Sequence, residues 1–273
     1  MTPVHHSLRH AAIEALSCAD LDGKVELTRS AYAAWSQRRL SLRDPRDPPV
    51  PDTPGRPDKP LLVSPTQVRK RSLSSEKGRF ALLHALAHIE LNAIDLALDI
   101  VARFATEPLP RSFFDGWLSV ADDEARHFTL LRERLSQLGG AYGDLPAHNG
   151  LWEAAHDTRE HLHARLAIVP MVLEARGLDV TPSMVAQLER AGDIESAAIL
   201  SIIYEDEKTH VAVGAKWFRF YCMRKGVVAA DAFQSLVRRH FRGSVRPPFN
   251  EIARAAAGLT PSFYRSLTAA SRS

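Results

Sequence analysis

The spacing of apolar residues along the chain indicates helices from one end to the other. Between Ser74 or Ser75, whose hydroxyls are suited to capping a helix, and Phe104, apolar side chains recur every three or four residues. This is the period of a helix that buries one face. The same pattern predicts helices over residues 2–38 (with a break near Gly23), 111–138, 151–176, 182–190 and 194–225, and shorter pieces over 227–273. No stretch alternates as a strand does, so the sequence predicts an all-α fold.

A proline-rich segment separates the first predicted helix from the others. Residues 41–65 include eight prolines, which lack an amide hydrogen and suit neither a helix interior nor a central strand. We expect an extended arm that is either a linker or a strap across the main domain. The chain then has three predicted parts: an N-terminal helix and proline-rich arm over 1–72, a four-helix bundle over 73–225, and a C-terminal helical extension over 226–273.

Glycine and proline mark the ends of the bundle helices. Gly139 and Gly140 are expected to stop the second helix, and Gly177 to stop the third. Pro170, inside the third helix, is expected to kink it one turn before Glu174. The polar connection over 139–150 would span roughly 40 Å when fully extended. That length is enough for the chain to return along the bundle.

Two pairs of potential metal ligands stand on predicted helices with the same spacing. Glu124 and His127 are three residues apart, and so are Glu207 and His210. On a helix, this spacing places both side chains of a pair on one side. Two such pairs on facing helices, with one glutamate from each of two further helices, form the di-metal site of carboxylate-bridged bundles. The spacing is short enough to arise by chance, so it does not decide alone.

The surroundings separate these pairs from two others with the same spacing. Glu153/His156 and Glu160/His163 lie in a segment that is polar on most faces, and we interpret them as solvated or channel-facing. A buried metal site needs its ligands within an apolar stripe, because the metal must offset the cost of removing them from water. The first two pairs have such stripes, made of Trp117, Val120, Ala121, Phe128 and Leu131 in one helix and Leu200, Ile203, Tyr204, Val211 and Gly214 in the other.

The register of the helices supplies the remaining two glutamates. Glu90 lies 34 residues before Glu124, and Glu174 lies 33 residues before Glu207. Each half of the bundle therefore contains one helix with a glutamate, a turn, and one helix with Glu-x-x-His. For Glu90 or Glu174 alone, a salt-bridged core glutamate is the competing interpretation. The repeat predicts two metal ions held by Glu90, Glu124, His127, Glu174, Glu207 and His210.

The composition of this ligand set narrows the choice of metal. Four carboxylates and two imidazoles, with no thiolate, suit iron or manganese better than copper or a structural zinc. Four carboxylates also match the charge of two divalent ions. We therefore expect two iron ions, with manganese or a mixed iron/manganese pair as the alternatives.

Several segments resemble a known family. They are ALLHALAHIELNAIDLALD, DDEARHF, VLEARGLD and YEDEKTHVAVG, and together they resemble an uncharacterised bacterial family with a ferritin-like domain. That family is similar to diiron tRNA hydroxylases, which have the same order of Glu, Glu-x-x-His, Glu, Glu-x-x-His. The resemblance implies a ferritin-like four-helix bundle, the same six metal ligands and tRNA as a partner. It leaves the substrate open.

Tyr204 is the candidate catalytic residue outside the ligand set. It lies one helical turn before Glu207, where its phenol would either hydrogen-bond beside the metals or carry redox chemistry. A core tyrosine with its hydroxyl satisfied elsewhere is the more ordinary interpretation. Four polar residues near Glu90 are off its helix face, and we expect packing or supporting roles for them: His84, His88, Asp95 and Asp99.

Composition and charge exclude other classes of protein. The two cysteines, Cys18 and Cys222, fit no metal or redox spacing, so we expect a reducing, cytoplasmic location. The N-terminal residues lack the apolar run of a signal peptide, and no stretch is apolar enough to span a membrane. The net charge of +3 does not by itself argue for nucleic acid. The basic clusters at 69–71, 224–225 and 238–239 are no larger than ordinary solvated surface, so the residues give tRNA little support.

Three functions remain open at this point. The first is an oxygen-dependent oxidoreductase, such as a hydroxylase, with an unknown substrate and an electron donor. The second is a ferroxidase or peroxide-handling protein, although the arm and the C-terminal extension exceed a minimal storage-cage subunit. The third is a non-catalytic interaction protein with a structural metal site. A homodimer is compatible with each of them.

Overall fold

The computed structural model describes residues 7–67 and 73–269, and within these ranges the chain is helical. The described residues contain no strand beyond two isolated bridges, so the predicted all-α fold is confirmed. The chain forms two compact units, residues 1–149 and 150–273. The basic cluster at 69–71 and residues 2–6 of the first predicted helix lie outside the described ranges. No helix in the described part is long and apolar enough to cross a membrane.

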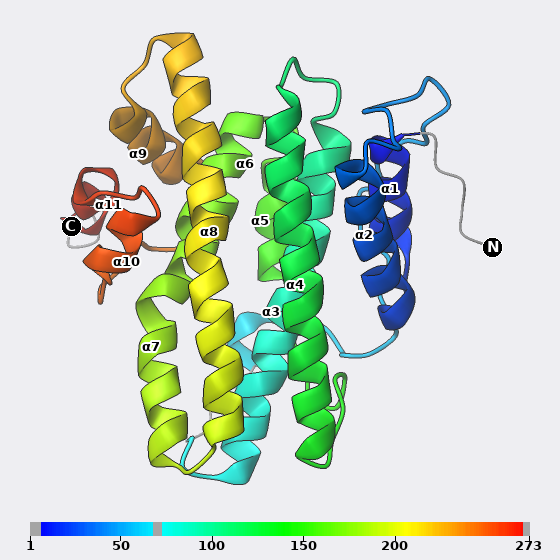
Figure 1. Cartoon of the computed structure of the whole chain (residues 1–273). Coiled ribbons are helices and arrows are strands. Elements are labelled where there is room, and N and C mark those ends of the chain that lie inside the picture. The colour runs from blue at the N-terminus through cyan, green and yellow to red at the C-terminus, as the bar shows by residue number, and fades with distance from the viewer. Residues whose placement is uncertain (1–6, 68–72, 270–273) are drawn as a thin grey trace. The chain divides into compact units, whose positions relative to one another are not determined.

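In the described part of the first unit, α1 and α2 form one hairpin and α3 and α4 form another (Figure 1), and a short 3₁₀ helix, η1, precedes α3. The first hairpin packs against the second, α1 against α3 and α2 against α4. Almost every side chain of α3 from position 87 onward is buried, so α3 is the central helix of this unit. The elements are α1 (Leu8–Ser17), α2 (Leu21–Ser36), η1 (Pro65–Gln67), α3 (Glu76–Arg103) and α4 (Arg111–Gln137).

The break that the sequence places near Gly23 lies earlier, at residues 18–20, and separates two helices. The chain leaves α1 at Cys18 and begins α2 after Asp20, whose carboxylate accepts a hydrogen bond from the Gly23 amide at 2.7 Å. Asp20 thus caps a new helix, and Gly23 lies in its first turn rather than at a break. The capping sequence was the better guide here than the glycine.

The predicted ends of α3 and α4 are confirmed. The Ser75 hydroxyl accepts from the Gly78 amide at the start of α3, and Phe104 follows its last residue. α4 ends at Gln137, and Gly139 adopts a left-handed conformation with φ of 82°. A residue with a Cβ is strained in that conformation, which explains why a glycine stands there.

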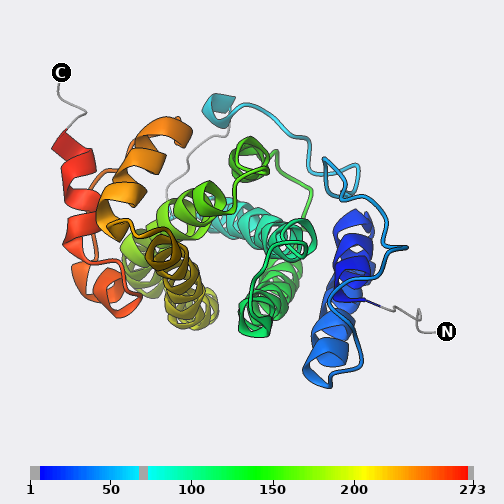
Figure 2. The same cartoon turned by 90° about the horizontal axis from the view of Figure 1, so that it is seen from above.

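The proline-rich arm is a strap within the first unit, which settles the choice between linker and strap. Figure 2 shows it as an irregular trace beside α1 and α2. Its backbone bonds to α1, where the Gly55 amide donates to the Leu16 carbonyl at 2.8 Å, and to the segment after α4, where Val63 donates to Ala147 at 2.8 Å. A Cβ on Gly55 would lie 2.1 Å from the Ser17 carbonyl oxygen, so only glycine allows this contact.

A buried lysine joins three parts of the first unit. The Lys24 ammonium is 2.5 Å from the Asp95 carboxylate of α3, and both side chains are 1% exposed. It also donates to the carbonyls of Ala15 and Leu16, which end α1 without partners inside the helix. Asp95 is therefore a structural partner of Lys24, in agreement with its position off the Glu90 face.

The second unit is built around a long helical hairpin. α7 and α8 lie side by side (Figure 1). Among the C-terminal helices, α9 packs against α6, α8 and α11, and α10 packs against α7 and α8. α8 has the bounds that the sequence predicts. The elements are α5 (Gly150–Asp157), α6 (Leu162–Ile168), η2 (Val169–Glu174, a π-helical segment), α7 (Ala175–Arg190), α8 (Ile194–Lys225), α9 (Ala229–His240), α10 (Glu251–Ala256) and α11 (Pro261–Ala269).

The continuous helix expected over 151–176 is wrong. It is interrupted after Asp157, where the Thr158 hydroxyl donates to the Ala154 and Ala155 carbonyls. The guanidinium of Arg165, itself 1% exposed, donates to the Ala155 carbonyl at 2.6 Å and to the Thr158 hydroxyl at 3.1 Å. These side chains satisfy the last carbonyls of α5, and they allow the helix to end there.

The expected stop at Gly177 and the separate helix over 182–190 are also wrong, because α7 runs through both positions. Pro182 lies inside α7 and cannot donate to the carbonyl of Leu178, four residues earlier. The Asn250 side-chain amide donates to that carbonyl instead, at 3.3 Å. A residue from the C-terminal extension, far beyond Pro182 in the chain, thus compensates for the proline.

The expected distortion at Pro170 is confirmed, and it takes the form of the π-helical segment η2. Gly214 of α8 faces this proline, since a Cβ at position 214 would lie 2.5 Å from the Pro170 ring. The absence of a side chain at Gly214 therefore lets α8 approach η2 closely. Such segments are often found at functional sites in helical proteins.

Candidate metal centre

The first unit brings together three of the predicted ligands. Glu90 of α3 and Glu124 and His127 of α4 each offer one ligand atom, and these atoms lie within 4.8 Å of one another. The Nδ1 atom of His127 is 3.3 Å from an oxygen of Glu90 and 3.3 Å from an oxygen of Glu124. Glu90 is 3% exposed, and the other two are fully buried.

The hairpin of α3 and α4 explains why these residues meet. Glu107 lies in the connection between the two helices, and Glu90 and Glu124 are equally far from it along the chain, on either side. Antiparallel helices therefore place both glutamates at the same level. The apolar stripe predicted around Glu124 is buried as expected, and it encloses the ligands: Trp117, Val120, Ala121, Phe128 and Leu131.

The electrostatics of this cluster favour a bound cation. Burial and the neighbouring charge of Glu124 raise the pKa of Glu90 well above its usual value. Burial by itself would lower the pKa of His127, but its hydrogen bonds to Glu124 and Glu90 outweigh this effect and raise the pKa to about 11. Two buried carboxylates thus draw a positive charge to the site. A divalent metal ion bound through these atoms would supply that charge in place of a proton, so the donor set fits a metal.

The second unit contains the other predicted Glu-x-x-His pair, on the second helix of its own hairpin. On α8, the Nδ1 atom of His210 is 3.8 Å from an oxygen of Glu207; His210 is fully buried, and Glu207 is 12% exposed. Glu174 is the last residue of η2. Gly192 lies in the turn of the hairpin, and Glu174 and His210 are equally far from it along the chain, on either side. Glu174 and His210 are therefore at the same level of the α7–α8 hairpin.

Glu174 lies at the junction of η2 and α7, and Gly177 does not end the helix after it. The helix continues into α7, and the distortion lies on the other side, in the η2 residues before Glu174. A π-helical turn has a wider spacing than an α-helical turn, so it changes the direction in which the following side chain points. The sequence predicted the distortion but not its form.

The two Glu-x-x-His pairs that were interpreted as solvated have exposed glutamates, as expected. Glu153 lies at the surface of α5, and Glu160 lies outside any helix. His163 approaches the Cys222 sulfur at 3.2 Å. The glutamates of these two pairs are thus exposed, whereas Glu124 is buried and Glu207 is 12% exposed, as the sequence predicts.

Tyr204 is half-buried, and its hydroxyl accepts a hydrogen bond from the Asn250 side-chain amide at 3.0 Å. The Lys208 ammonium lies 4.6 Å from the centre of its ring. The hydroxyl therefore has a partner from the C-terminal extension, as in the more ordinary of the two interpretations. A catalytic role for Tyr204 stays a prediction.

The histidines beside Glu90 hold the segment that follows α4. His84 accepts from the Gly143 amide at 2.9 Å. His88 contacts the Tyr142 hydroxyl at 2.8 Å and the His148 carbonyl at 3.0 Å. Both are packing groups, as predicted. Sequence reasoning missed a cavity on this side of α3, where Arg56 of the strap meets Asn92, because no motif marks either residue.

The fold and the cluster together define an all-helical protein with a buried carboxylate–histidine group suited to a metal ion. The chain belongs to the family described as "Protein of unknown function (DUF455)", whose model matches residues 17–265. An uncharacterized protein of Haemophilus influenzae is 43% identical over 208 residues, which cover 74% of this chain and 72% of the relative. No solved structure matches the chain. The resemblance to an uncharacterised bacterial family is thus confirmed.

Proposed function

We propose that this chain is an oxygen-dependent oxidoreductase, a hydroxylase in class, with a ferritin-like bundle that holds two iron ions. The observation that carries the proposal is the buried group of Glu90, Glu124 and His127, whose ligand atoms converge within 4.8 Å. The proposed ligands of the two ions are Glu90, Glu124, His127, Glu174, Glu207 and His210.

The repeat of the hairpins supports extension from three ligands to six. In the first unit, Glu90 of α3 stands level with the Glu-x-x-His pair of α4; in the second, Glu174, the residue that directly precedes α7, stands level with the pair of α8. Three carboxylate or imidazole ligands are few for an iron ion, which commonly takes five or six. Two half-sites of the same composition would complete a carboxylate-bridged pair, the arrangement known from helical bundles.

Iron is the metal that this donor set favours, with manganese as its closest competitor. Carboxylate and imidazole ligands suit these ions, and a structural zinc or a copper site would use thiolates or more imidazoles. The carboxylates also balance the charge of two divalent ions, which reduces the cost of burying them.

When bound, a reduced iron pair would supply the electrons that reduce dioxygen, so that one of its oxygen atoms can be inserted into a substrate C–H bond. The overall reaction consumes dioxygen, two electrons and two protons, and it releases the hydroxylated product and water. The chain itself fixes Glu90 on α3 and Glu124 and His127 on α4, and it excludes water with the apolar stripe around Glu124. The His127 imidazole, between two carboxylates at 3.3 Å, is held in one orientation by them.

The first test is the metal content of the purified protein, measured by elemental analysis together with an absorption spectrum. We expect about two irons per chain, in keeping with the paired sites of this class of bundle. Glu124→Ala should lose most of the iron. Glu153→Ala is the matched control, because Glu153 has the same spacing to a histidine but is exposed.

Two results would contradict the proposal. Absence of bound metal after anaerobic loading with ferrous iron would exclude the metal centre. Continuous oxygen consumption with excess ferrous iron, many times the amount of protein, would instead identify a ferroxidase. An oxygenase without its substrate should stop after the bound iron has reacted once.

A further inference from the structure

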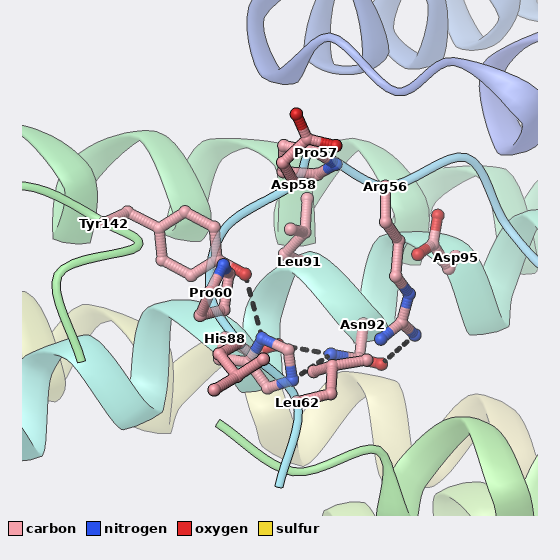
Figure 3. Close-up of a pocket in the computed structure, with 11 residues that line it drawn as sticks. Arg56, Pro57, Asp58, Pro60, Leu62, His88, Leu91, Asn92, Asp95 and Tyr142 are labelled. Carbon is pink, nitrogen blue, oxygen red and sulfur yellow. Dashed lines mark hydrogen bonds between the residues drawn. The ribbon is translucent and has the colours of Figure 1, made fainter. Parts of the chain in front are cut away.

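A cavity of about 190 Å³ lies in the first unit, between the strap and helix α3 (Figure 3). Its walls are largely apolar and include Leu91 of α3, Leu62 of the strap and the ring of Tyr142. Leu61 and Leu62 are 70% and 41% exposed, so this edge of the cavity meets solvent. For comparison, an engineered apolar cavity of about 150 Å³ binds benzene.

A guanidinium group from the strap reaches into this cavity. One terminal nitrogen of Arg56, Nη2, donates to the Asn92 side-chain oxygen at 2.6 Å. The other, Nη1, is buried and has no hydrogen-bond partner among the described residues. Figure 3 shows Arg56, Asn92 and His88 directed toward one another. A buried cationic donor without an acceptor is costly, so this nitrogen calls for an acceptor that the protein does not provide.

The nearby carboxylates of α3 are already engaged by other cations. Asp95 is 2.5 Å from the Lys24 ammonium, and Asp99 is 2.8 Å from the Arg103 guanidinium. Asp58, which also lines the cavity, is exposed to solvent. Asp95 itself lines the cavity, but neither α3 carboxylate accepts a hydrogen bond from Nη1 of Arg56.

The other polar groups of the cavity have partners within the first unit. The Asn92 amide nitrogen donates to the His88 carbonyl at 2.7 Å, which leaves its oxygen facing Arg56. The Nε2 atom of His88 lies 3.0 Å from the His148 carbonyl and 3.1 Å from the Asn92 amide nitrogen, and its Nδ1 atom lies 2.8 Å from the Tyr142 hydroxyl. These groups have their partners, so they shape the cavity and hold Arg56 in place.

We infer that this cavity binds a small monocarboxylate with a compact apolar body. The carboxylate accepts from Nη1 of Arg56, and the apolar body fills the space against Leu91, Leu62 and the Tyr142 ring. The one guanidinium nitrogen without a partner matches a single carboxylate group better than a phosphate dianion, which presents more acceptor oxygens. A charge-assisted hydrogen bond in a cavity with apolar walls gives both affinity and orientation.

This site is separate from the proposed metal centre, and the inference does not rest on it. The α3 residues that line the cavity are about 100° to 160° around the helix from Glu90. The cavity and Glu90 therefore lie on different faces of α3. A carboxylate in the cavity would contact the strap, whereas Glu90 faces Glu124 and His127 of α4.

The test is calorimetric titration of the full-length protein with benzoate, butyrate and acetate, and with benzamide as the uncharged counterpart of benzoate. We expect at least one carboxylate to bind with a dissociation constant in the millimolar range or below, and benzamide to bind at least about tenfold more weakly. Arg56→Gln should weaken carboxylate binding by about tenfold or more. Arg46→Gln is the matched control, since Arg46 lies on the same strap and its side chain is 73% exposed.

A second variant keeps the inference testable if Arg56→Gln does not fold. Leu62→Trp leaves Arg56 intact and fills the cavity from its solvent edge, so it should also abolish binding. Circular dichroism would verify the fold of each variant. Lack of binding by all three carboxylates would overturn the inference, and so would equal binding of benzamide. Loss of binding in Glu124→Ala but not in Arg56→Gln would overturn it too, because the carboxylate would then be a ligand of the metal centre.

Discussion

In the second unit, the side chain of one histidine, His163, lies among aromatic rings and a thiol. Its ring centre is 4.4 Å from the ring centres of both Phe218 and Tyr221, and its Nε2 atom is 3.2 Å from the Cys222 sulfur. Burial lowers the pKa of this histidine from 6.5 to about 4. The folded protein thus holds the neutral ring at pH values at which the unfolded chain binds a proton.

This difference predicts a pH-dependent contribution of His163 to stability. The contribution should be complete above pH 6.5 and be lost as the pH falls from 6.5 to about 4, because only the unfolded state is protonated in that interval. Since the ring is partly exposed to screening solvent, the loss should be about 2 kcal/mol, less than the full shift in pKa would give. Urea denaturation of the wild type and of His163→Phe at a series of pH values measures it. Parallel stability curves for the two proteins across this interval would contradict the prediction.

The residue scale also shows what a motif can and cannot predict. Four Glu-x-x-His pairs have the same local spacing, and the apolar residues around Glu124, such as Trp117 and Phe128, correctly indicated that this glutamate is buried. Arg56 could not be found in this way, because it lies in an irregular strap without periodicity. Its role depends on Asn92, which is 36 residues away in the chain.

Two glycines show how packing decides the effect of a residue within an element. Gly177 lies in α7, and a Cβ added there would meet no other atom within 4 Å. Gly214 lies in α8, where a Cβ would be 2.5 Å from the ring of Pro170. Both glycines reduce the intrinsic stability of their helices. Only at Gly214 does the absence of a side chain allow two elements, α8 and η2, to pack closely.

Alanine at these two positions should therefore have opposite effects. Gly177→Ala should stabilise the protein by about 0.5–1 kcal/mol, since alanine favours the helix. Gly214→Ala should destabilise it by about 1–3 kcal/mol, because the methyl group forces η2 and α8 apart. Chemical denaturation of each variant measures the difference. A stabilised Gly214→Ala protein would show that η2 yields to the methyl group without cost.

Element bounds could be predicted wherever the signals were local. The Ser75 cap and the bounds of α8 followed from residues within or next to each helix. The bounds of α5 and α7 could not, because the groups that set them are distant side chains. Arg165 completes the end of α5, and Asn250 takes the carbonyl that Pro182 leaves free.

At the scale of the whole molecule, each unit contains a hairpin with one glutamate on its first helix or directly before it and a Glu-x-x-His pair on its second. The sequence revealed this repeat through the separations of 34 and 33 residues. It did not reveal that the helices α1 and α2 and the strap pack with the α3–α4 hairpin in one unit. Those contacts join residues far apart in the chain, such as Val63 and Ala147.

Metal bound only by the folded protein should stabilise the whole molecule. At free iron concentrations about 100 times the dissociation constant, the gain is about 2.7 kcal/mol. For a chain of this size that corresponds to a rise of roughly 5–10 °C in the melting temperature. Chelation should remove the gain in the wild type and in Glu153→Ala, and it should change nothing in Glu124→Ala. Equal melting temperatures with and without metal in anaerobic calorimetry would contradict the prediction.

The strap has a consequence for the order in which a ribosome can complete this protein. Residues 41–65 are synthesised early, but Val63 pairs with Ala147, which is synthesised much later, after both α3 and α4. The strap can take its final position only after both helices of the α3–α4 hairpin have left the exit tunnel. Until then its apolar side chains are open to other molecules. The first unit can therefore complete its fold only as synthesis of the second unit begins. Until then the strap lacks its contact with Ala147.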